Sequence, residues 1–229
     1  MTGRIVHVVV PAHDEEELLG ACLASVATAA ARLLAEVPGV VVRTTVVLDR
    51  CTDASAAIAA TYGVDTVVVD AANVGVARAA GLDRVAALAD GHPSERVLVA
   101  STDADCVVPD RWLVDLHALA AAGHDLVVGA VHPDPEDLPL GALERWREWH
   151  RRPEAHVHGA NLAFTLAAYV RSGGLRPVGL HEDVLLVTAM RAAGCRWTAG
   201  TSVQTSGRTT SRVRGGFASY LAALVVQPD

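Results

Sequence analysis

The sequence predicts an α/β fold in which a mostly parallel central sheet is flanked by helices. Four segments rich in Val, Ile and Leu recur before residue 102, and alanine-rich helical patterns separate them. This alternation is typical of parallel strands joined by crossover helices. The 229 residues contain no internal repeat and no low-complexity linker. We therefore expect one domain, 1–229, with two functional halves, 1–106 and 107–229.

The first half has the more regular pattern. Its predicted strands cover residues 5–10, 40–48, 66–69 and 96–100. The predicted helices between them cover residues 15–36, 53–62 and 75–89. Pro38 and Gly39 end the first helix and Gly63 ends the second, because these residue types commonly follow a helix C-terminus.

The second half is less regular. Asp110 is a suitable N-cap for a helix over 111–122. The later predictions are a strand over 125–131, a proline-containing loop over 132–140, a short helix with Trp146 and Trp149, a helix over 182–193, a strand over 197–205 and a weak helix over 215–226. For the apolar segment 217–226 we expect packing on the sheet, with a homodimer contact or a membrane surface as alternatives.

The composition excludes several kinds of chemistry. All 19 basic residues are arginine, against 26 acidic residues, so the net charge is −7 and the pI about 5.8. Without lysine the chain forms no Schiff base and has no P-loop of the form GxxxxGK[ST]. The net negative charge argues against nucleic acid as a partner.

The cysteines and the apolar segments indicate where the chain functions. Its four cysteines are scattered and form no CxxC motif, which fits a reduced, cytoplasmic location. The longest uncharged apolar stretch near the start, 18–31, is well below the ~20 residues that cross a bilayer. We therefore expect no membrane span.

Acidic residues gather where the predicted strands end. The strand over 5–10 leads into PAHDEE, the strand over 40–48 into DRCTD, and the strand over 96–100 into STDAD. Parallel strands bring such ends to one edge of the sheet, where ligands bind. A divalent metal ion is the natural counter-charge in a chain without lysine. The alternative is helix capping, which suits Glu15 and Asp53 better than Asp103 and Asp105.

The turn after the first strand also excludes a dinucleotide-dependent oxidoreductase. Such enzymes place a GxGxxG motif there, and PAHDEE has no glycine. The later segment NVGVAR offers a close backbone approach and one cation, Arg78.

In their order along the chain, VVVPAHDEE, VVLDRCTDAS, ANVGVARAAGL, ASTDADCVVPDRWL, HGANLAF and GLHEDVLL resemble the motifs of the inverting family 2 glycosyltransferases of the GT-A fold. The resemblance spans roughly residues 5–190. It implies a Rossmann-like, mostly parallel sheet with an acceptor-side C-terminal half. It also implies a hexosyltransferase that uses Mn²⁺ or Mg²⁺ to move a sugar from a UDP- or GDP-linked donor to an acceptor hydroxyl.

The resemblance assigns roles to individual residues. Asp183 of the Glu182–Asp183 pair would be the general base, and Asp105 with Asp103 would ligate the metal ion. The nucleotide-sugar site would include Pro11, Ala12, His13, Glu15, Asp49, Asn73, Gly75, Arg78, Asp103 and Ala104. Gly159, Ala160 and Asn161 would shape the junction between donor and acceptor. Trp146 and Trp149 fit either stacking on an acceptor sugar or core packing.

The sequence departs from the family pattern at three places. His13 and Asp14 replace the common Tyr and Asn, Leu48 and Arg50 interrupt the second motif, and no histidine follows the Glu182–Asp183 helix. The segment TSGRTTSRVRGG stands where that histidine is expected. We predict that Arg208 and Arg212 close over the diphosphate, because one guanidinium group can donate two parallel hydrogen bonds to phosphate oxygens. A solvated basic loop is the alternative.

Two other functions remain open. DADCV fits the nucleophile loop of haloacid-dehalogenase-like phosphatases, although those enzymes need a lysine and an earlier DxD. The altered first two motifs also suit a catalytically silent nucleotide-sugar-binding protein. Metal-dependent stabilisation by UDP or GDP counts against the phosphatase.

Overall fold

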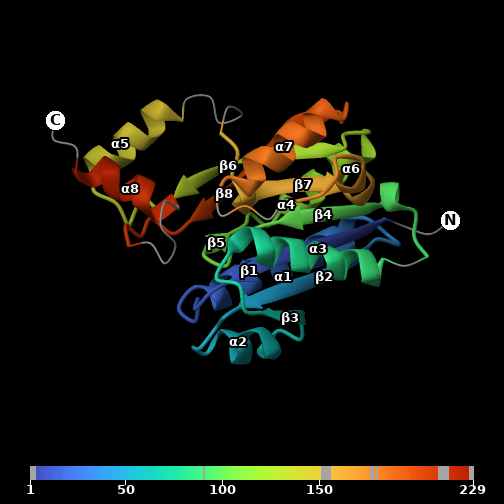
Figure 1. Ribbon diagram of the computed structural model, residues 1–229, viewed down its shortest axis with the longest axis horizontal. Coiled ribbons are helices and arrows are strands. Elements are labelled where there is room, and N and C mark those ends of the chain that lie inside the picture. The colour runs from blue at the N-terminus through green and yellow to red at the C-terminus, as the bar shows by residue number, and fades with distance from the viewer. Residues whose placement is uncertain are drawn as a thin grey trace.

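The computed structural model describes residues 4–89, 91–150, 156–175, 178, 180–210 and 217–226. One eight-stranded sheet, in the order β3-β2-β1-β4-β7-β6-β8-β5, runs through the centre of the molecule (Figure 1). Its strands are β1 (Ile5–Ala12), β2 (Val41–Asp49), β3 (Asp65–Val69), β4 (Val97–Ser101), β5 (Cys106–Val107), β6 (Leu126–Pro133), β7 (Leu162–Thr165) and β8 (Trp197–Thr205). The helices are α1 (Leu19–Glu36), α2 (Ser55–Thr61), α3 (Val74–Leu88), α4 (Trp112–Ala121), α5 (Leu140–Trp149), α6 (Leu166–Arg171), α7 (Glu182–Ala192) and α8 (Phe217–Val226), with short 3₁₀ turns η1 (Ser94–Arg96) and η3 (Gly159–Asn161).

Strand direction divides the sheet into two parts. β3, β2, β1 and β4 are parallel, as the alternation of strands and helices predicts. β7 then runs antiparallel to both β4 and β6, with Leu162 opposite Ser101 and Val128. β7 therefore begins at the edge of the sheet where β4 ends. This edge receives the turns that carry the acidic motifs.

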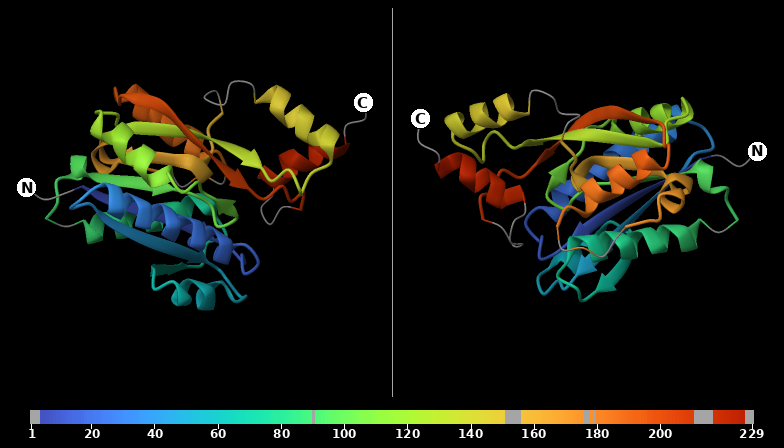
Figure 2. Two further views of the ribbon diagram at one scale, coloured as in Figure 1. Left: turned by 180° about the vertical axis from the view of Figure 1, so that it is seen from behind. Right: turned by 45° about the horizontal axis from the view of Figure 1, so that its top comes forward.

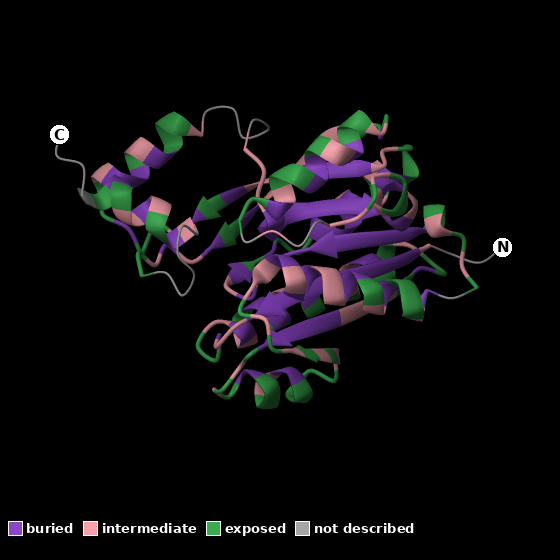
Figure 3. Cartoon of the chain, viewed as in Figure 1, coloured by how far each residue is buried: buried purple, intermediate pink, exposed green. Residues whose placement is uncertain are grey.

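Helices cover both faces of the sheet. α1 and α4 lie on one face, and α3, α6 and α7 lie on the other (Figures 1 and 2). β1, β4 and β7 are buried along their whole length between these two layers (Figure 3). Gly81 lets α3 approach the sheet closely, because a Cβ there would lie 2.5 Å from Cγ1 of Val9.

A third apolar cluster lies at one end of the molecule, where α5 and α8 pack together (Figure 1). Leu138, Ala142 and Trp146 meet Leu221 and Leu224 in this cluster. The Arg145 side chain donates hydrogen bonds of 3.0 and 2.7 Å to the Leu224 carbonyl near the end of α8. The apolar segment 217–226 therefore packs mainly on α5 and only through Phe217 on the main core, which corrects the expectation of packing on the sheet.

Several predicted boundaries need correction. α1 begins at Leu19 rather than at residue 15, because the Glu15 carbonyl accepts hydrogen bonds from the N–H groups of Leu18 and Leu19 in a preceding turn. Asp110 does not cap α4; its carboxylate pairs with Arg32, and Arg111 is the N-cap residue. The strands β5 and β7 were not predicted, because each is too short to show a hydrophobic alternation.

Of the helices that the structure describes, α1 alone is long and apolar enough by length and composition to cross a membrane. It has 18 residues, including Arg32 and Glu36, and so exceeds the apolar stretch counted from the sequence. One face of α1, which includes Leu23, Val26 and Leu33, is buried in the main core.

Candidate active site

A cavity of about 760 Å³ opens at the edge where β1, β2 and β4 end. Most of the predicted site residues line it, namely Pro11, Ala12, His13, Glu15, Asp49, Asn73, Arg78, Asp103, Ala104, Asp105, Gly159, Ala160, Glu182, Asp183 and Arg208. Gly75, Asn161 and Trp146 do not line it. Arg212 lies outside the described residues.

Asp49 at the end of β2 shapes the turn that follows β3. Its Oδ1 accepts hydrogen bonds of 2.9 Å from the N–H groups of both Ala71 and Ala72, and its Oδ2 accepts one of 2.8 Å from Asn73. These bonds hold Ala72 at a positive φ of 47°. Asn73 then caps α3 by accepting a bond from Val76 N–H. Both oxygens of the Asp49 carboxylate thus already have backbone partners in this conformation.

Arg78 on α3 joins two carboxylates from distant parts of the chain. Its guanidinium contacts Oδ1 of Asp103 at 2.5 Å and also pairs with the buried Glu182. Burial alone would lower the pKa of Arg78, but the charges of Asp103 and Glu182 outweigh it and raise the pKa above its ordinary value. A Cβ on Gly159 would overlap this guanidinium. The glycine of HGAN therefore makes room for the ion pairs.

Arg208 makes a second set of ion pairs. Its guanidinium donates bidentate hydrogen bonds of 2.8 and 2.6 Å to Glu15, and it lies 3.2 Å from Oδ2 of Asp105. Burial and the neighbouring Asp103 charge raise the pKa of Asp105 to about 6, although Arg208 opposes this shift. Asp105 therefore carries a charge at neutral pH that its surroundings only partly compensate.

The charge balance of the cavity fits a divalent cation. Among the described lining residues, six carboxylates face two guanidinium groups, an excess of four negative charges when the histidines are neutral. Carboxylate oxygens are the ligands that Mn²⁺ and Mg²⁺ prefer. Asp103 and Asp105 supply two of these carboxylates, and burial together with the Asp103 charge raises the pKa of Asp105.

Asp183 lies in the first turn of α7 and faces the cavity. Its Oδ2 accepts a hydrogen bond of 2.7 Å from Gly159 N–H, and its Oδ1 accepts one of 2.8 Å from Val184 N–H. Two backbone donors thus fix the position of a carboxylate that stays open to the cavity. Such an arrangement suits a group that takes a proton from a bound hydroxyl.

The model of the family described as glycosyl transferase family 2 matches residues 7–170. The chain belongs to this family. It is a glycosyltransferase, and the expected GT-A fold is confirmed by solved structures of related architecture. The phosphatase alternative is therefore wrong.

Two solved glycosyltransferases illustrate the likeness. S. aureus TarS is 14% identical with a TM-score of 0.62, and the match covers 88% of this chain but only 36% of TarS. The glucosyl-3-phosphoglycerate synthase from Mycobacterium tuberculosis, in complex with phosphoglyceric acid, is 18% identical with a TM-score of 0.60, covering 99% of this chain and 82% of that one. The same synthase in complex with Mn²⁺, UDP and glucosyl-3-phosphoglycerate is 19% identical with a TM-score of 0.58, and the match covers 98% of this chain and 77% of that one. At these identities the likeness concerns the fold. No curated protein matches the sequence.

Two residues that were predicted for the acceptor side of this family 2 glycosyltransferase, Trp146 and Asn161, are buried and do not line the cavity. Trp146 is 1% exposed and belongs to the α5–α8 cluster. Asn161 is buried, accepts a hydrogen bond of 3.0 Å from Trp112 Nε1, and donates bonds of 2.8 Å to the carbonyls of Ala130 and Thr201. Asn161 therefore ties η3 to β6 and β8, behind the wall that Gly159 and Ala160 form.

Sequence reasoning missed part of the cavity lining. The cavity of the glycosyltransferase is also lined by Trp149, His150, His156, His158, His181, Thr205, Ser206, Phe217 and Tyr220. The two histidines of the HVHGAN segment and the aromatic spacing in α5 and α8 were the available signals. Trp149 was a candidate for stacking on an acceptor sugar, but His150, Phe217 and Tyr220 were not identified, because the sequence does not place α8 against α5.

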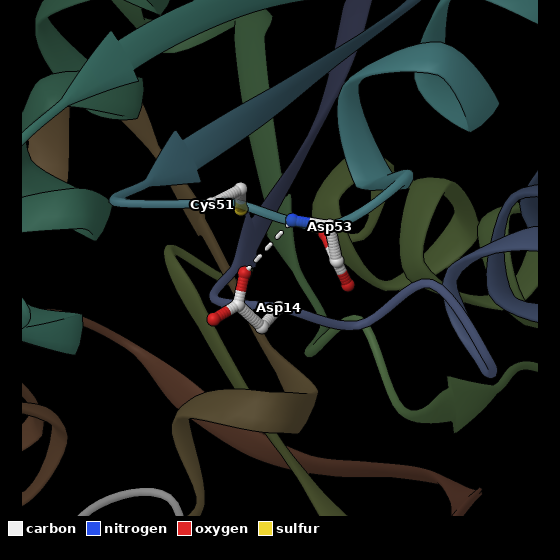
Figure 4. Close-up of side chains that lie close together, drawn as sticks. All are labelled: Asp14, Cys51 and Asp53. Carbon is white, nitrogen blue, oxygen red and sulfur yellow. Dashed lines mark hydrogen bonds between the residues drawn. The ribbon is translucent and has the colours of Figure 1, made fainter.

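A smaller acidic cluster lies beside the first two turns of the glycosyltransferase. In the part of the chain that the structure describes, Asp14, Cys51 and Asp53 form the one group of three or more metal-ligand side chains whose ligand atoms all lie within 4.8 Å (Figure 4). Asp14 Oδ1 accepts hydrogen bonds of 2.7 Å from Thr52 N–H and 3.3 Å from Asp53 N–H, and the Thr52 bond lowers the pKa of Asp14. The Asp14 carboxylate therefore joins the two turns.

Proposed function

We propose that this glycosyltransferase moves a sugar from a UDP- or GDP-linked donor to an acceptor hydroxyl with inversion at the anomeric carbon, and that Mn²⁺ or Mg²⁺ assists the reaction. The observation that carries the proposal is that the Asp103–Asp105 pair and the Asp183 carboxylate line one cavity. A solved complex of the M. tuberculosis synthase contains Mn²⁺ and UDP, which supports this class of donor.

The donor half of the site would handle the diphosphate. Asp103 and Asp105 would hold the metal ion, which stabilises negative charge on the leaving diphosphate when bound. Arg208 would exchange its contacts with Glu15 and Asp105 for phosphate oxygens, which guanidinium groups bind bidentately. Arg212 would assist from the neighbouring segment. Pro11, Ala12 and His13 would border the nucleotide.

Asp183 would act as the general base. Its carboxylate, positioned by the N–H groups of Gly159 and Val184, would take the proton from the attacking acceptor hydroxyl. The hydroxyl oxygen would form a bond to the sugar C1 as the bond between C1 and the phosphate oxygen breaks. A single displacement of this kind inverts the anomeric configuration. Glu182 would hold Arg78 beside the donor.

We also propose that the two halves of the chain divide the work. Residues 1–106 provide the strand-end carboxylates and Arg78, and residues 107–229 provide Asp183 and the aromatic side chains of Trp149, Phe217 and Tyr220. Arg208 is an exception, since it reaches from the second half to Glu15 in the first. The cytoplasmic location and the homodimer stay predictions.

Thermal unfolding with nucleotides tests the donor class. UDP or GDP at about 100 times its Kd should stabilise the protein by about 2.7 kcal/mol, and only with Mn²⁺ or Mg²⁺ present. A panel of UDP- and GDP-sugars then identifies the donor through metal-dependent hydrolysis, and NMR of the transfer product reports the anomeric configuration. The proposal is contradicted if the nucleotide stabilises the protein equally with and without the metal ion, or if the product retains the anomeric configuration of the donor.

A further inference from the structure

The end of the cavity that faces α5 and α8 is lined by rings. We call this end the aromatic lobe and define it as Trp149, His150, His156, His158, Phe217 and Tyr220. The chain has only four Trp, three Tyr and two Phe residues. Four of these nine, the three in the lobe and Trp146 behind them, gather here. Such a concentration in a chain poor in aromatic residues needs an explanation beyond core packing.

Trp146 holds the lobe together from behind. Its buried ring stacks on His150 with centroids 3.5 Å apart. It also meets Phe217 and Tyr220 edge to face at 5.3 and 5.7 Å. These contacts fix ring orientations on the cavity side, because aromatic packing of this kind restricts side-chain rotation. The lobe is therefore a preformed surface.

Trp149 provides the exposed ring of this surface. It is 50% exposed, although it lines the cavity, and its centroid lies 6.0 Å from that of Tyr220. Leaving so large an apolar ring in contact with water is unfavourable in the free protein. A ligand that covers the ring recovers this free energy. Tryptophan and tyrosine are well suited to such contacts because each combines an apolar face with a polar edge.

The charges in and around the aromatic lobe indicate which net charge its ligand carries. Burial lowers the pKa of His150 to about 4 and also lowers the pKa of His158, so both imidazoles are neutral at pH 7. Among the described residues, the guanidinium groups that line the cavity, those of Arg78 and Arg208, are already paired with carboxylates. Burial lowers the pKa of His158, and the negative charge of Asp183, which lines the same cavity, acts in the opposite direction. An anionic acceptor would face this negative charge without a free cation in the described lining.

From these contacts we propose that the aromatic lobe is the acceptor subsite and that its ligand is a neutral carbohydrate ring. The C–H face of the ring would stack on Trp149 and Tyr220. Its hydroxyl edge would exchange hydrogen bonds with the neutral imidazoles, and one hydroxyl would reach Asp183. The assignment of this hydroxyl as nucleophile rests on the proposed function, whereas carbohydrate binding by the lobe does not. The subsite differs from one for an anionic acceptor such as the phosphoglyceric acid bound to the M. tuberculosis synthase.

Saturation-transfer difference NMR on the full chain tests the subsite without requiring turnover. The probes are the methyl α- and β-glycosides of glucose, galactose and mannose, with 3-phosphoglycerate as the anionic comparison, each with and without UDP and Mn²⁺. We expect saturation of ring C–H protons in at least one glycoside. Trp149→Ala should reduce that signal about fivefold or more, because it removes the stacking ring.

Two further variants separate stacking from general damage. Trp149→Phe keeps an aromatic ring and should retain most of the signal. Leu140→Ala removes a side chain from the same helix that is 69% exposed and lies outside the cavity, so it should leave the signal unchanged. Circular dichroism melts check that each variant folds.

The outcomes distinguish the subsite from the proposed function. The subsite is overturned if no glycoside gives a signal, if the signal persists in Trp149→Ala, or if 3-phosphoglycerate alone binds. A glycoside signal that depends on Trp149, in a protein that neither UDP nor GDP stabilises in the presence of Mn²⁺ or Mg²⁺, supports the subsite and refutes the proposed donor. Stabilisation by UDP and Mn²⁺ without any glycoside signal refutes the subsite and leaves the donor proposal standing.

Discussion

The backbone of Gly159 lies so close to the guanidinium of Arg78 that a Cβ on residue 159 would overlap Cζ and Nη1 of the arginine. The same glycine donates its N–H to Asp183, and its carbonyl accepts a hydrogen bond of 2.8 Å from Ser101 Oγ. Gly159 thus contacts Arg78, the predicted base and the end of β4. It is required here for space, since its φ is not in the positive range.

Replacing Gly159 with alanine should displace Arg78 and leave Asp103 and Glu182 without their partner. Loss of one partner from a buried ion pair typically costs about 3–5 kcal/mol, so the free energy of unfolding should fall by about that amount. Urea unfolding measures the change. Gly20→Ala is the control, because nothing lies within 4 Å of a Cβ there and alanine favours the helix by up to ~1 kcal/mol. A change of under ~0.5 kcal/mol in Gly159→Ala would contradict this account.

Arg208→Gln should strengthen the binding of Mn²⁺ alone and weaken the binding of UDP with Mn²⁺. The substitution frees the carboxylates of Glu15 and Asp105 from their guanidinium partner and removes a group expected to meet the diphosphate. We expect about tenfold in each direction, measured by isothermal titration calorimetry, equivalent to about 1.4 kcal/mol. Arg84→Gln is a matched control, because it breaks the pair with Asp65 outside the cavity. Equal Mn²⁺ affinity in the wild type and Arg208→Gln would refute the competition.

Asp183→Asn should abolish transfer and keep metal-dependent UDP binding. The amide oxygen still accepts the hydrogen bond from Gly159 N–H, but the amide cannot take a proton. A positioned general base typically contributes about 10²–10⁴-fold to the rate. Glu182→Gln provides the contrast, since it breaks the buried pair with Arg78 and should lower stability. If Asp183→Asn loses UDP affinity in proportion to its activity, the residue belongs to the donor site.

The pKa of Asp105 makes stability without metal depend on pH. The value of about 6 in the folded protein lies above the ordinary 3.8, so the folded state binds the extra proton between these pH values. Stability therefore falls as pH rises from about 4 to 6, by on the order of 3 kcal/mol in total from this group. Asp105→Asn should remove that part of the slope and stabilise the metal-free protein at pH 8. Urea unfolding of both proteins at pH 4.5 and 8 measures the difference; parallel curves would disprove it.

The sequence predicted the parallel half of the sheet well, because its strands and helices each satisfy a simple periodicity. The strand over 197–205 matches β8, and the helix over 182–193 differs from α7 by one residue. Predictions of hydrogen bonds made by single side chains were less reliable. Asp110 has the chemistry of an N-cap, yet the more distant Arg32 takes its carboxylate. Tertiary pairing prevailed over a local hydrogen bond at that position.

The site was predictable as a set of residues but not as a set of contacts. Arg78 and Glu182 are 104 residues apart, and Glu15 and Arg208 are 193 apart, so no local pattern links them. Trp146 and Trp149 look equivalent in sequence. The packing of α8 on α5 buries the first and leaves the second in the cavity. That distinction depends on a helix pair that only the folded chain brings together.

The antiparallel strand β7 has an evolutionary consequence. The chain leaves the sheet at the end of β6 and returns through η3 into β7, whose pairing with β4 and β6 fixes where Gly159 stands. Insertions or deletions between residues 134 and 158 would therefore reshape the end of the cavity that α5 lines, without moving the ends of β1 and β4. The lining of one end of the cavity can therefore vary in length and shape while the carboxylates at the ends of β1 and β4 keep their places.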